Sequence, residues 1–539
     1  MWRPGGEAPG REEKGTENWR KEMLARCYSG ALAGVDARLV EIEVDSSLGT
    51  SSFAIVGLPD TAVKEAKDRI PTAIGNSGFS LKQEYDVTVN LAPADVRKEG
   101  AIYDLPIAAA LLTSIGKIPA ASLEGRALVG ELALSGAVRP VRGILPMVTE
   151  MRRIGCRSIV VPMGNVREAS VVEGIDVIGV ETLREAAEYL SGRLRIEPVR
   201  ADMAALVSAA ACDSGDDFAD VRGQDSAIEA VTVAVAGGHN ILMIGSPGSG
   251  KTMLARRIPG ILPPLSVEEA LEVSRIHSVA GFAKSAEPLM VRRPFRAPHH
   301  TVSSIGLLGG GTKPVPGEVS LAHRGVLFLD EFAEFPRQAL EVLRQPLEDG
   351  HVGVSRAAAA CDFPSRFMLV AAMNPCPCGY YNDPRHRCRC TMSQILRYQS
   401  RVSGPIVDRI DIQVEVPAVD AGRLPMMPGG PTSASLRERV LAARERQRER
   451  YRGLGGAVTN AEVKSRHLPD ACKLTDGMRV ELARMIDKLN LSARAYDKVL
   501  RVARTIADLA GSDAVTGEHL LSAALYRRLD VRGENSFWA

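Results

Sequence analysis

The sequence predicts an α/β protein whose parallel sheet carries a P-loop. The apolar run Ile241–Ile244 leads into the glycine-rich stretch Gly245-Ser246-Pro247-Gly248-Ser249-Gly250-Lys251-Thr252, which a helical pattern follows. A second apolar run, Val326–Leu329, ends in Asp330-Glu331, and strand-like and helix-like patterns alternate before the P-loop. Short apolar runs bounded by turn residues are typical of buried strands. A strand, a glycine-rich loop and a helix in that order form the context in which a P-loop binds phosphate.

The elements follow from these patterns in chain order. Strands are expected at residues 40–44, 53–56, 87–91, 158–161, 351–354 and 367–372, and helices at 62–76, 105–114 and 144–154. Near the end of the chain only helices are expected, at 436–451, 478–489, 495–509 and 517–529.

Breaks in these patterns divide the chain. Residues 1–22 are polar and aperiodic and are expected to be disordered, with Met23 as a candidate physiological start. A first α/β domain is expected at 23–197, a linker at 198–218, the nucleotide domain at 219–420, a Pro/Gly-rich linker at 421–435 and a helical domain at 436–532.

Each residue type of the two motifs suits phosphate chemistry. The glycines let successive backbone N–H groups face phosphate oxygens. Lys251 neutralises the β and γ phosphates of ATP, and the Thr252 hydroxyl binds Mg²⁺. Asp330 is expected to bind the same Mg²⁺, and Glu331 to polarise the attacking water. The alternative is a chance match in a chain with 50 glycines, but two motifs in this order predict ATP hydrolysis.

Composition limits the remaining possibilities. The 539 residues are 45% hydrophobic, which allows about three globular domains. The net charge of +2 does not indicate nucleic acid, so any such binding would use local basic surfaces. A polar amino terminus and the lack of a stretch of ~20 apolar residues predict a cytoplasmic protein with no membrane partner. Nine cysteines favour reduced thiols or a metal over disulfides.

Four further motifs carry a family resemblance. They are Phe295-Arg296-Ala297-Pro298-His299-His300-Thr301, Pro316-Gly317-Glu318-Val319-Ser320-Leu321-Ala322-His323, Asn374-Pro375-Cys376-Pro377-Cys378-Gly379 and Ser403-Gly404-Pro405-Ile406-Val407-Asp408-Arg409-Ile410-Asp411. With the P-loop they resemble the magnesium-chelatase-like AAA+ ATPases of the ComM/YifB type, from about Met23 to the end. The resemblance implies a P-loop AAA+ core with a helical lid, preceded by a Lon-protease-C-terminal-like (S5 domain 2-like) α/β domain. It also implies a hexameric ring and a DNA-translocating role such as branch migration during DNA uptake and recombination.

Three more residues match roles known in AAA+ proteins. Asn374 follows the strand expected at 367–372 and resembles sensor 1, an amide that orients the attacking water; the alternative is an Asn that caps a turn. Arg494, at an expected helix start, resembles sensor 2, with a surface arginine as the alternative. Arg409 resembles the arginine finger that reaches a neighbouring subunit's γ-phosphate. Its alternative is a salt bridge to Asp408 or Asp411, and Arg401 is the second candidate finger.

Two Cys-x-Cys pairs suggest a metal site. Four thiolates, from Cys376, Cys378, Cys388 and Cys390, could enclose a tetrahedral Zn²⁺, with His386 as a spare ligand. The spacing departs from the usual Cys-x₂-Cys pattern, so free thiols in a loop are the alternative.

A basic segment between the P-loop helix and Asp330 is a candidate DNA-contacting loop. It contains Arg292, Arg293, Arg296, His299, His300, the glycines 309–311 and Lys313, and Arg356 could tip a second hairpin. Cations on flexible loops follow a phosphate backbone in a ring channel. The alternative is a solvated basic loop or a subunit contact, since aromatic stacking partners are few.

The amino-terminal domain is not expected to cleave peptides. Where the segment 97–104 resembles the Lon protease nucleophile motif, Ile102 occupies the serine position, and Leu145 and Met147 stand at the lysine positions. Tyr103 lies one position from the nucleophile and has no base beside it. The domain is therefore expected to pack, oligomerise or bind a partner.

Three functions remain open at this point. The first is an ATP-driven ring motor on single-stranded or branched DNA. The second is a chelatase-type ATPase that remodels a protein partner, although chelatase motor subunits lack a Lon-like domain. The third is a scaffold whose ATP site controls assembly.

Overall fold

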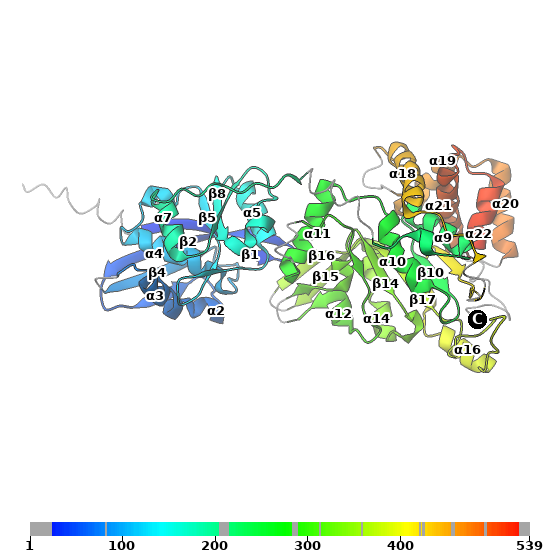
Figure 1. Ribbon diagram of the computed structural model, residues 1–539, viewed down its shortest axis with the longest axis horizontal. Coiled ribbons are helices and arrows are strands. Elements are labelled where there is room, and N and C mark those ends of the chain that lie inside the picture. Colours follow the sequence, from blue (N-terminus) through cyan, green and yellow to red (C-terminus); the bar gives the residue numbers. More distant parts are fainter. Residues whose placement is uncertain are drawn as a thin grey trace, which may run out of the picture. The chain divides into compact units, whose positions relative to one another are not determined.

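The chain folds into two compact units that contain sheets and helices, which confirms the predicted α/β class (Figure 1). This computed structural model describes residues 24–80, 84–203, 215–282, 289–311, 314–356, 359–419, 422, 426–453, 459–489 and 493–527. The first unit comprises the chain up to Met203 together with His277–Leu289, and the second comprises the rest. Among the helices so described, none is long and apolar enough to cross a membrane. The predicted extension, residues 1–22, lies outside the described ranges.

The first unit is built on a mixed sheet of seven strands in the order β3-β4-β2-β1-β5-β8-β9. The strands are β1 (Leu24–Ala33), β2 (Asp36–Leu48), β3 (Phe53–Val56), β4 (Tyr85–Ala92), β5 (Arg126–Leu128), β8 (Ser158–Pro162) and β9 (Asp176–Val180). A separate ribbon pairs β6 (Glu131–Leu132) with β7 (Val138–Arg139). β2 is antiparallel to β1 and β4, and the other neighbours are parallel.

Helices cover both faces of this sheet. They are α2 (Thr61–Lys64), α3 (Ala66–Asn76), α4 (Asp104–Ser114), α5 (Ile144–Arg153), α6 (Val166–Ala169) and α7 (Leu183–Leu190). On β1, Cys27 donates from Sγ to the Pro106 carbonyl of α4, whereas Gly30 lies against Met147 of α5. Because residues of opposite parity on a strand point to opposite faces, α4 and α5 lie on opposite sides. The single helix expected at 62–76 is interrupted at Glu65.

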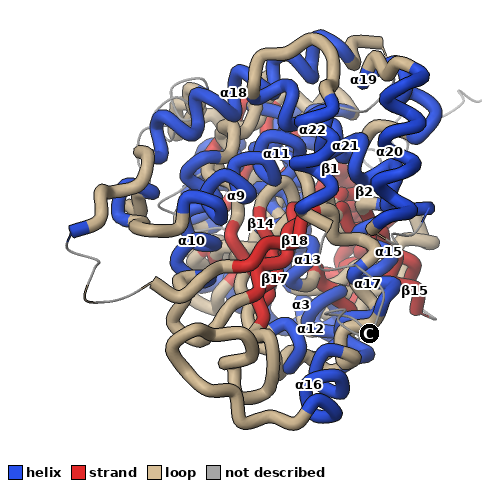
Figure 2. Tube along the Cα trace, turned by 90° about the vertical axis from the view of Figure 1, so that its right-hand side faces the viewer, coloured by secondary structure: helices blue, strands red, loops and turns tan. Residues whose placement is uncertain are grey.

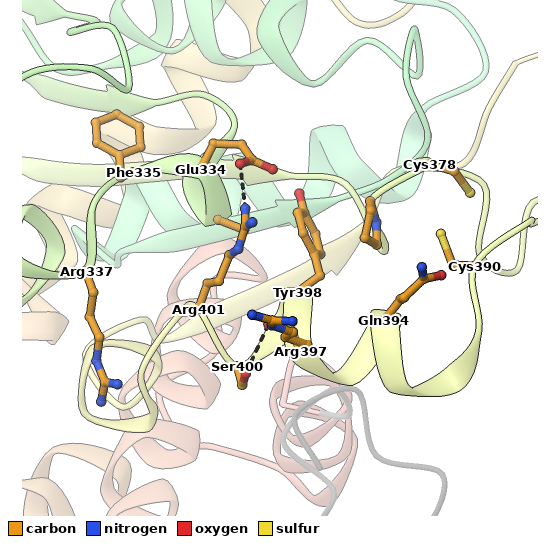
Figure 3. A pocket seen from close by; sticks show the side chains of 12 residues that line it. Glu334, Phe335, Arg337, Cys378, Cys390, Gln394, Arg397, Tyr398, Ser400 and Arg401 are labelled. Carbon is orange, nitrogen blue, oxygen red and sulfur yellow. Dashed lines mark hydrogen bonds and ion pairs between the residues drawn. The ribbon is translucent and has the colours of Figure 1, made fainter.

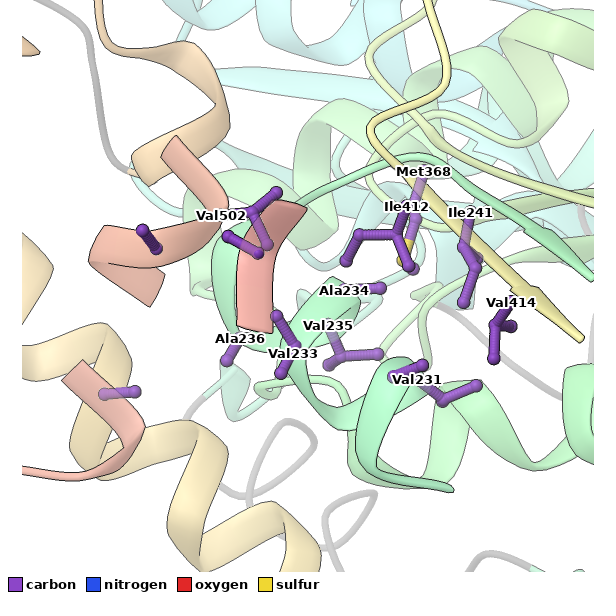
Figure 4. Close-up of a cluster of buried hydrophobic side chains, with 14 of the residues drawn as sticks. Val231, Val233, Ala234, Val235, Ala236, Ile241, Met368, Ile412, Val414 and Val502 are labelled. Carbon is purple, nitrogen blue, oxygen red and sulfur yellow. The ribbon is translucent and has the colours of Figure 1, made fainter. Parts of the chain in front are cut away.

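The second unit contains a parallel five-stranded sheet in the order β11-β14-β17-β10-β18. Its strands are β10 (Ile241–Ile244), β11 (Phe295–Arg296), β14 (Val326–Leu329), β17 (Met368–Met373) and β18 (Ile412–Glu415). β10, β14 and β17 are buried along their whole lengths, as expected of parallel strands covered on both faces. Figure 4 shows Ile241 and Ile412 facing Val231 and Val235 of helix α9 in this core.

Helices and two hairpins surround this sheet. The helices are α9 (Asp225–Gly237), α10 (Lys251–Ile261), α11 (Val267–Ala280), α12 (Ser304–Leu308), α13 (Glu318–Leu321), α14 (Arg337–Glu341), α15 (Arg344–Asp349), α16 (Met392–Gln399) and α17 (Gly404–Val407). The hairpins pair β12 (Gly309–Gly310) with β13 (Val315–Pro316), and β15 (His351–Arg356) with β16 (Ala359–Pro364).

The unit ends in a helical group, as the sequence predicts. It contains α18 (Ser433–Arg450), α19 (Leu468–Cys472), α20 (Asp476–Lys488), α21 (Ala493–Leu509) and α22 (Gly517–Leu525). Figure 2 shows α19 to α22 gathered together, away from α16. Buried hydrogen bonds tie this group to the segment before β10. His239 Nε2 lies 2.8 Å from Thr505 Oγ1, and Gln447 donates to the Ala236 carbonyl.

Candidate nucleotide-binding site

The glycine-rich loop joins β10 to α10 with the backbone that a P-loop requires. Gly248 and Gly250 have φ values of 74° and 92°, which side chains rarely tolerate. At Gly245, an added Cβ would lie 2.3 Å from the Val416 carbonyl oxygen. The loop therefore needs glycine at these three positions, and it delivers Lys251 to the first turn of α10.

Parallel strands bring the remaining predicted groups to the same edge of the sheet. Asp330 follows β14 and Asn374 follows β17, at the carboxyl ends of two neighbouring strands, and β17 also pairs with β10. Thr252 donates from Oγ1 to Asp330 Oδ2 at 2.6 Å. The hydroxyl and carboxylate predicted to bind Mg²⁺ are thus in contact, with chemistry that suits this hard cation.

The Lys251 ammonium group lies among oxygen atoms of the P-loop and of Asn374. Its Nζ lies 2.7 Å from the Gly245 carbonyl oxygen, 3.0 Å from that of Ser246 and 3.3 Å from Asn374 Oδ1. The residue is 8% exposed. Burial lowers the pKa of Lys251 to about 8, although Asp330 favours the charged form. A bound triphosphate would supply the negative charge that this ammonium group needs.

Glu331 is held by a histidine from the segment after β11. Its carboxylate is 56% exposed, and Oε2 lies 2.9 Å from His300 Nδ1. The backbone of Glu331 has a φ of 52°, and its N–H donates to Asp330 Oδ1 at 2.9 Å. A positive φ is uncommon for a residue that has a side chain, so the backbone of Glu331 adopts a conformation that glycine would adopt more easily.

Arg409 lies at the opposite edge of the sheet from Lys251. It precedes β18, whose first residue Ile412 pairs with Ile241, the first residue of β10. Asn240, just before β10, donates to the Arg409 carbonyl at 3.0 Å. A four-residue strand spans ~13 Å at about 3.3 Å per residue. The Arg409 backbone therefore lies about one strand length from the chain's own P-loop.

The ion pair of Arg409 is one that the sequence did not suggest. Its guanidinium contacts the carboxylate of Glu348 on α15 and donates to the Pro405 carbonyl at 2.5 Å. Asp411, one of the two expected partners, instead lies 3.4 Å from His239 and 3.6 Å from Lys498. Arg409 and Glu348 lie far apart in the sequence, and only the tertiary packing of α15 brings them together. The sequence pattern therefore could not predict this ion pair.

Arg401, the second candidate finger, lines a cavity of about 1050 Å³ (Figure 3). It pairs with Glu334 at 2.6 Å and lies 5.7 Å from the centre of the Tyr398 ring. Arg397 and Arg337 line the same cavity. Arg494 lies in the first turn of α21, as predicted for its backbone. Its side chain lies outside the described part of the structure.

The four cysteines converge. Their Sγ atoms all lie within 4.8 Å of one another. The Cys376 sulfur lies 3.4 Å from that of Cys378 and 3.7 Å from that of Cys388, and the last two sulfurs lie 3.6 Å apart. A tetrahedral Zn²⁺ with bonds of about 2.3 Å would place sulfurs ~3.8 Å apart. Burial opposes the thiolate of Cys378, but the backbone N–H groups of Arg389 and Tyr380 and the thiols of Cys376 and Cys390 together lower its pKa to about 6, whereas burial raises the pKa of Cys376. The predicted spare ligand, His386, pairs instead with Asp383.

Several cations of the basic segment already have partners within the chain. Arg293 donates to the Pro263 and Arg324 carbonyls and pairs with Glu269 at 3.1 Å. Arg296 forms a bidentate pair with Glu318 at 2.7 Å. Both guanidinium groups therefore hold the domain together, which argues against their following a phosphate backbone. Lys313 and the Arg356 side chain lie outside the described residues.

The positions that resemble the Lon catalytic pair are apolar. Leu145 and Met147 are fully buried in α5, and Ile102 packs against the core of the first unit. Burial raises the pKa of Tyr103 far above its usual value. No side chain at these positions can act as the nucleophile or its base.

Sequence reasoning missed three residues that build the site. Gln224 donates to the Ser249 and Pro417 carbonyls at 2.9 and 2.7 Å. Asp383 accepts a hydrogen bond from Ser246 at 2.6 Å, and His300 holds Glu331. Asp383 lies between the two cysteine pairs, and that placement was the one sequence signal for it.

Comparisons with known proteins agree with this geometry. Family profiles match over residues 217–424 (Magnesium chelatase, subunit ChlI), 42–165 (Subunit ChlI of Mg-chelatase) and 430–527 (Magnesium chelatase, subunit ChlI C-terminal). The chain is 44% identical to the uncharacterized protein YifB of Escherichia coli (strain K12), over 94% of this chain and 97% of that protein. It is 43% identical to the competence protein ComM of Haemophilus influenzae, over 94% of this chain and 98% of that protein. A shorter match, 25% identical over 28% of this chain and 26% of the relative, is to Lon protease 2 of Bacillus subtilis.

These matches confirm the resemblance that the sequence motifs predicted. With a P-loop at the carboxyl edge of a parallel sheet and relatives that match over nearly their full lengths, this chain belongs to the magnesium-chelatase-like AAA+ family that includes YifB and ComM.

Proposed function

We propose that this protein is an ATP-hydrolysing ring motor that acts on DNA. The observation that carries the ATPase proposal is the convergence at one sheet edge of Lys251, the Thr252–Asp330 contact and Asn374. In this proposal Lys251 binds the β and γ phosphates, Thr252 and Asp330 hold Mg²⁺, and Asn374 orients the water that Glu331 polarises. Mg²⁺ would neutralise charge that develops on the γ-phosphate.

The position of Arg409 supports a ring assembly. Because it lies at the amino edge of the sheet, its guanidinium could complete only the site of a neighbouring subunit, where it would stabilise the transition state. A hexamer is the assembly that we propose. In it Arg409 would exchange Glu348 for the γ-phosphate, and the helical group α18–α22, as a lid, would move with nucleotide state through Arg494.

DNA as the track is supported by a relative rather than by a contact. ComM of Haemophilus influenzae is named a competence protein, and we propose that this chain likewise acts on single-stranded or branched DNA in uptake and recombination, in the cytoplasm. Arg293 and Arg296 of the basic segment are committed to carboxylates, so contacts to DNA would come from other residues of the segment, such as His299. The Lon-like, S5 domain 2-like first unit would then pack, oligomerise or bind a partner.

The second candidate is a chelatase-type ATPase that remodels a protein partner. The three matching family profiles favour it, because all of them describe magnesium chelatase subunit ChlI. Both candidates share the same hydrolytic site, and they differ in what the motion of the ring acts on.

One experiment separates the candidates. ATP turnover by the purified, size-defined oligomer is measured alone, with single-stranded DNA, with a branched junction and with duplex DNA. The motor proposal expects stimulation by single-stranded or branched DNA together with strand displacement. Turnover that no polynucleotide changes, on an assembled ring, would count against DNA as the track and favour a protein substrate.

A further inference from the structure

The loop that carries the four cysteines touches the P-loop at two consecutive residues. Asp383 accepts the Ser246 hydroxyl at 2.6 Å. Gly379, at a φ of 85°, approaches Pro247 so closely that an added Cβ would lie 2.5 Å from Pro247 Cδ. The backbone of the cysteine loop therefore packs directly against the tip of the phosphate-binding loop.

The Asp383 carboxylate is built to receive that hydroxyl. Its side chain is 1% exposed, and it also accepts the backbone N–H groups of Arg385 at 2.8 Å and His386 at 3.0 Å. Three donors on one occluded carboxylate define its orientation, so the position of Ser246 depends on the shape of the cysteine loop.

No regular secondary structure shapes the described loop. All residues between β17, which ends at Met373, and α16, which begins at Met392, are described, and they form no helix or strand. The four sulfurs lie at the two ends of the turn that contains Asp383. The separations among Cys376, Cys378 and Cys388 are 3.4 to 3.7 Å, and the Cys390 sulfur lies within 4.8 Å of the others. The three distances exceed the ~2.05 Å of a disulfide and approach the edge of a tetrahedral metal–thiolate site.

We propose that Cys376, Cys378, Cys388 and Cys390 bind one structural Zn²⁺, and that this ion holds the P-loop in its nucleotide-binding conformation through Asp383 and Gly379. Four sulfur donors in a closed tetrahedral arrangement select zinc over Mg²⁺ or Ca²⁺. The ion would join both ends of a loop that lacks regular structure, and the free energy of metal binding would then stabilise the loop.

The same ion would also fix the sensor strand. Asn374, whose Oδ1 lies 3.3 Å from Lys251 Nζ, precedes Cys376 by two residues. Gln399 on α16 donates to the intervening Pro375 carbonyl at 3.0 Å, so the segment is anchored on the helix side as well. The effect on nucleotide rests on the proposed function of the P-loop, whereas the zinc site itself does not.

The test measures metal and nucleotide separately. Protein purified without chelator is analysed for zinc and iron by elemental mass spectrometry, and the dissociation constant for a fluorescent ATP analogue is measured on the same sample. We expect about one zinc ion per chain. The variant Cys378→Ser/Cys388→Ser should lose the zinc and bind the analogue about tenfold more weakly, the loss expected when a charged hydrogen-bond partner is misplaced.

Two further variants separate the ion from its relay. Asp383→Ala should keep the zinc and still bind the analogue more weakly, because only the Ser246 anchor is removed. Cys361→Ser, which changes a cysteine of β16 outside the cluster, should keep both zinc and affinity. Circular dichroism checks that each variant remains folded.

The outcomes are distinct. Wild-type protein without zinc, or with iron in its place, overturns the metal assignment. Zinc that is lost from the double cysteine variant with no change in nucleotide affinity overturns the link to the P-loop. Wild-type protein that holds zinc but binds no ATP analogue contradicts the proposed function and leaves the zinc assignment standing.

Discussion

His300 Nδ1 lies 2.9 Å from Glu331 Oε2, so the residue expected to polarise the attacking water is held by a side chain from the neighbouring strand's end. β11 and β14 pair in parallel, and the segments that follow them emerge side by side. Because Oε2 is engaged with the imidazole, Glu331 can accept a proton from water only through its other carboxylate oxygen. We predict that this contact restrains hydrolysis.

The first prediction concerns this contact. His300→Ala should raise ATP turnover measured without DNA by about fivefold, a typical coupling between two states, and should reduce the stimulation that DNA produces. His299→Ala, whose ring contacts Thr301 and His300 rather than Glu331, is the matched control for turnover without DNA only. Lower or unchanged turnover in His300→Ala would show that the histidine positions Glu331 instead of restraining it.

The second prediction separates binding from hydrolysis. Lys251→Ala should weaken ATP binding by about ten- to a hundredfold, because a hydrogen bond to a charged group contributes about 1.5–3 kcal/mol. Glu331→Gln should retain ATP binding and lose about 10²- to 10⁴-fold in turnover, the usual contribution of a general base. Analogue binding and phosphate release measure the two effects, and equal loss of binding in both variants contradicts the assigned roles.

The third prediction tests whether Arg409 acts between subunits. Arg409→Ala should lower turnover by about 10³-fold, as loss of an arginine finger does, while ATP still binds. Oligomers mixed from Arg409→Ala and Lys251→Ala chains should regain part of the activity, because some interfaces then combine an intact P-loop with an intact arginine.

Two controls accompany the mixing experiment. Glu348→Gln removes the ion pair of Arg409 without removing the arginine, so it should keep most of the turnover. Arg401→Ala tests the second candidate finger. Mixed oligomers as inactive as their parents would argue against completion of the site in trans.

Local chemistry explains which parts of the site the sequence could reveal. The P-loop is recognisable because consecutive backbone N–H groups must face phosphate, and this requirement is met within one short segment. Asp330 and Asn374 were predictable because each follows a buried strand, and parallel strands end at one edge. The α/β class followed from the same apolar runs.

Contacts made through tertiary packing left no such signal. Glu348 reaches Arg409 from α15, and His300 reaches Glu331 from the segment after β11, in both cases without a characteristic spacing. The arginines of the basic segment suggested a DNA-contacting loop, yet Arg296 pairs with Glu318, which lies in another motif. Charge along the sequence does not distinguish a solvated cation from one that is internally paired.

The last prediction uses the lowered pKa of Lys251. Burial depresses the pKa in the folded, nucleotide-free protein to about 8, below the value of about 10.4 in an unfolded chain. The unfolded chain therefore binds more protons between these values, and the contribution of this lysine to stability rises as pH rises from 8 towards 10.

A bound triphosphate reverses the balance for Lys251, because its negative charge favours the ammonium form. ATP binding at pH 9 should therefore take up a proton, whereas binding at pH 7, where Lys251 is already charged, should not. Calorimetric titrations in buffers of different ionisation enthalpy measure this uptake. Equal uptake at both pH values would mean that the lysine does not change its protonation state when nucleotide binds.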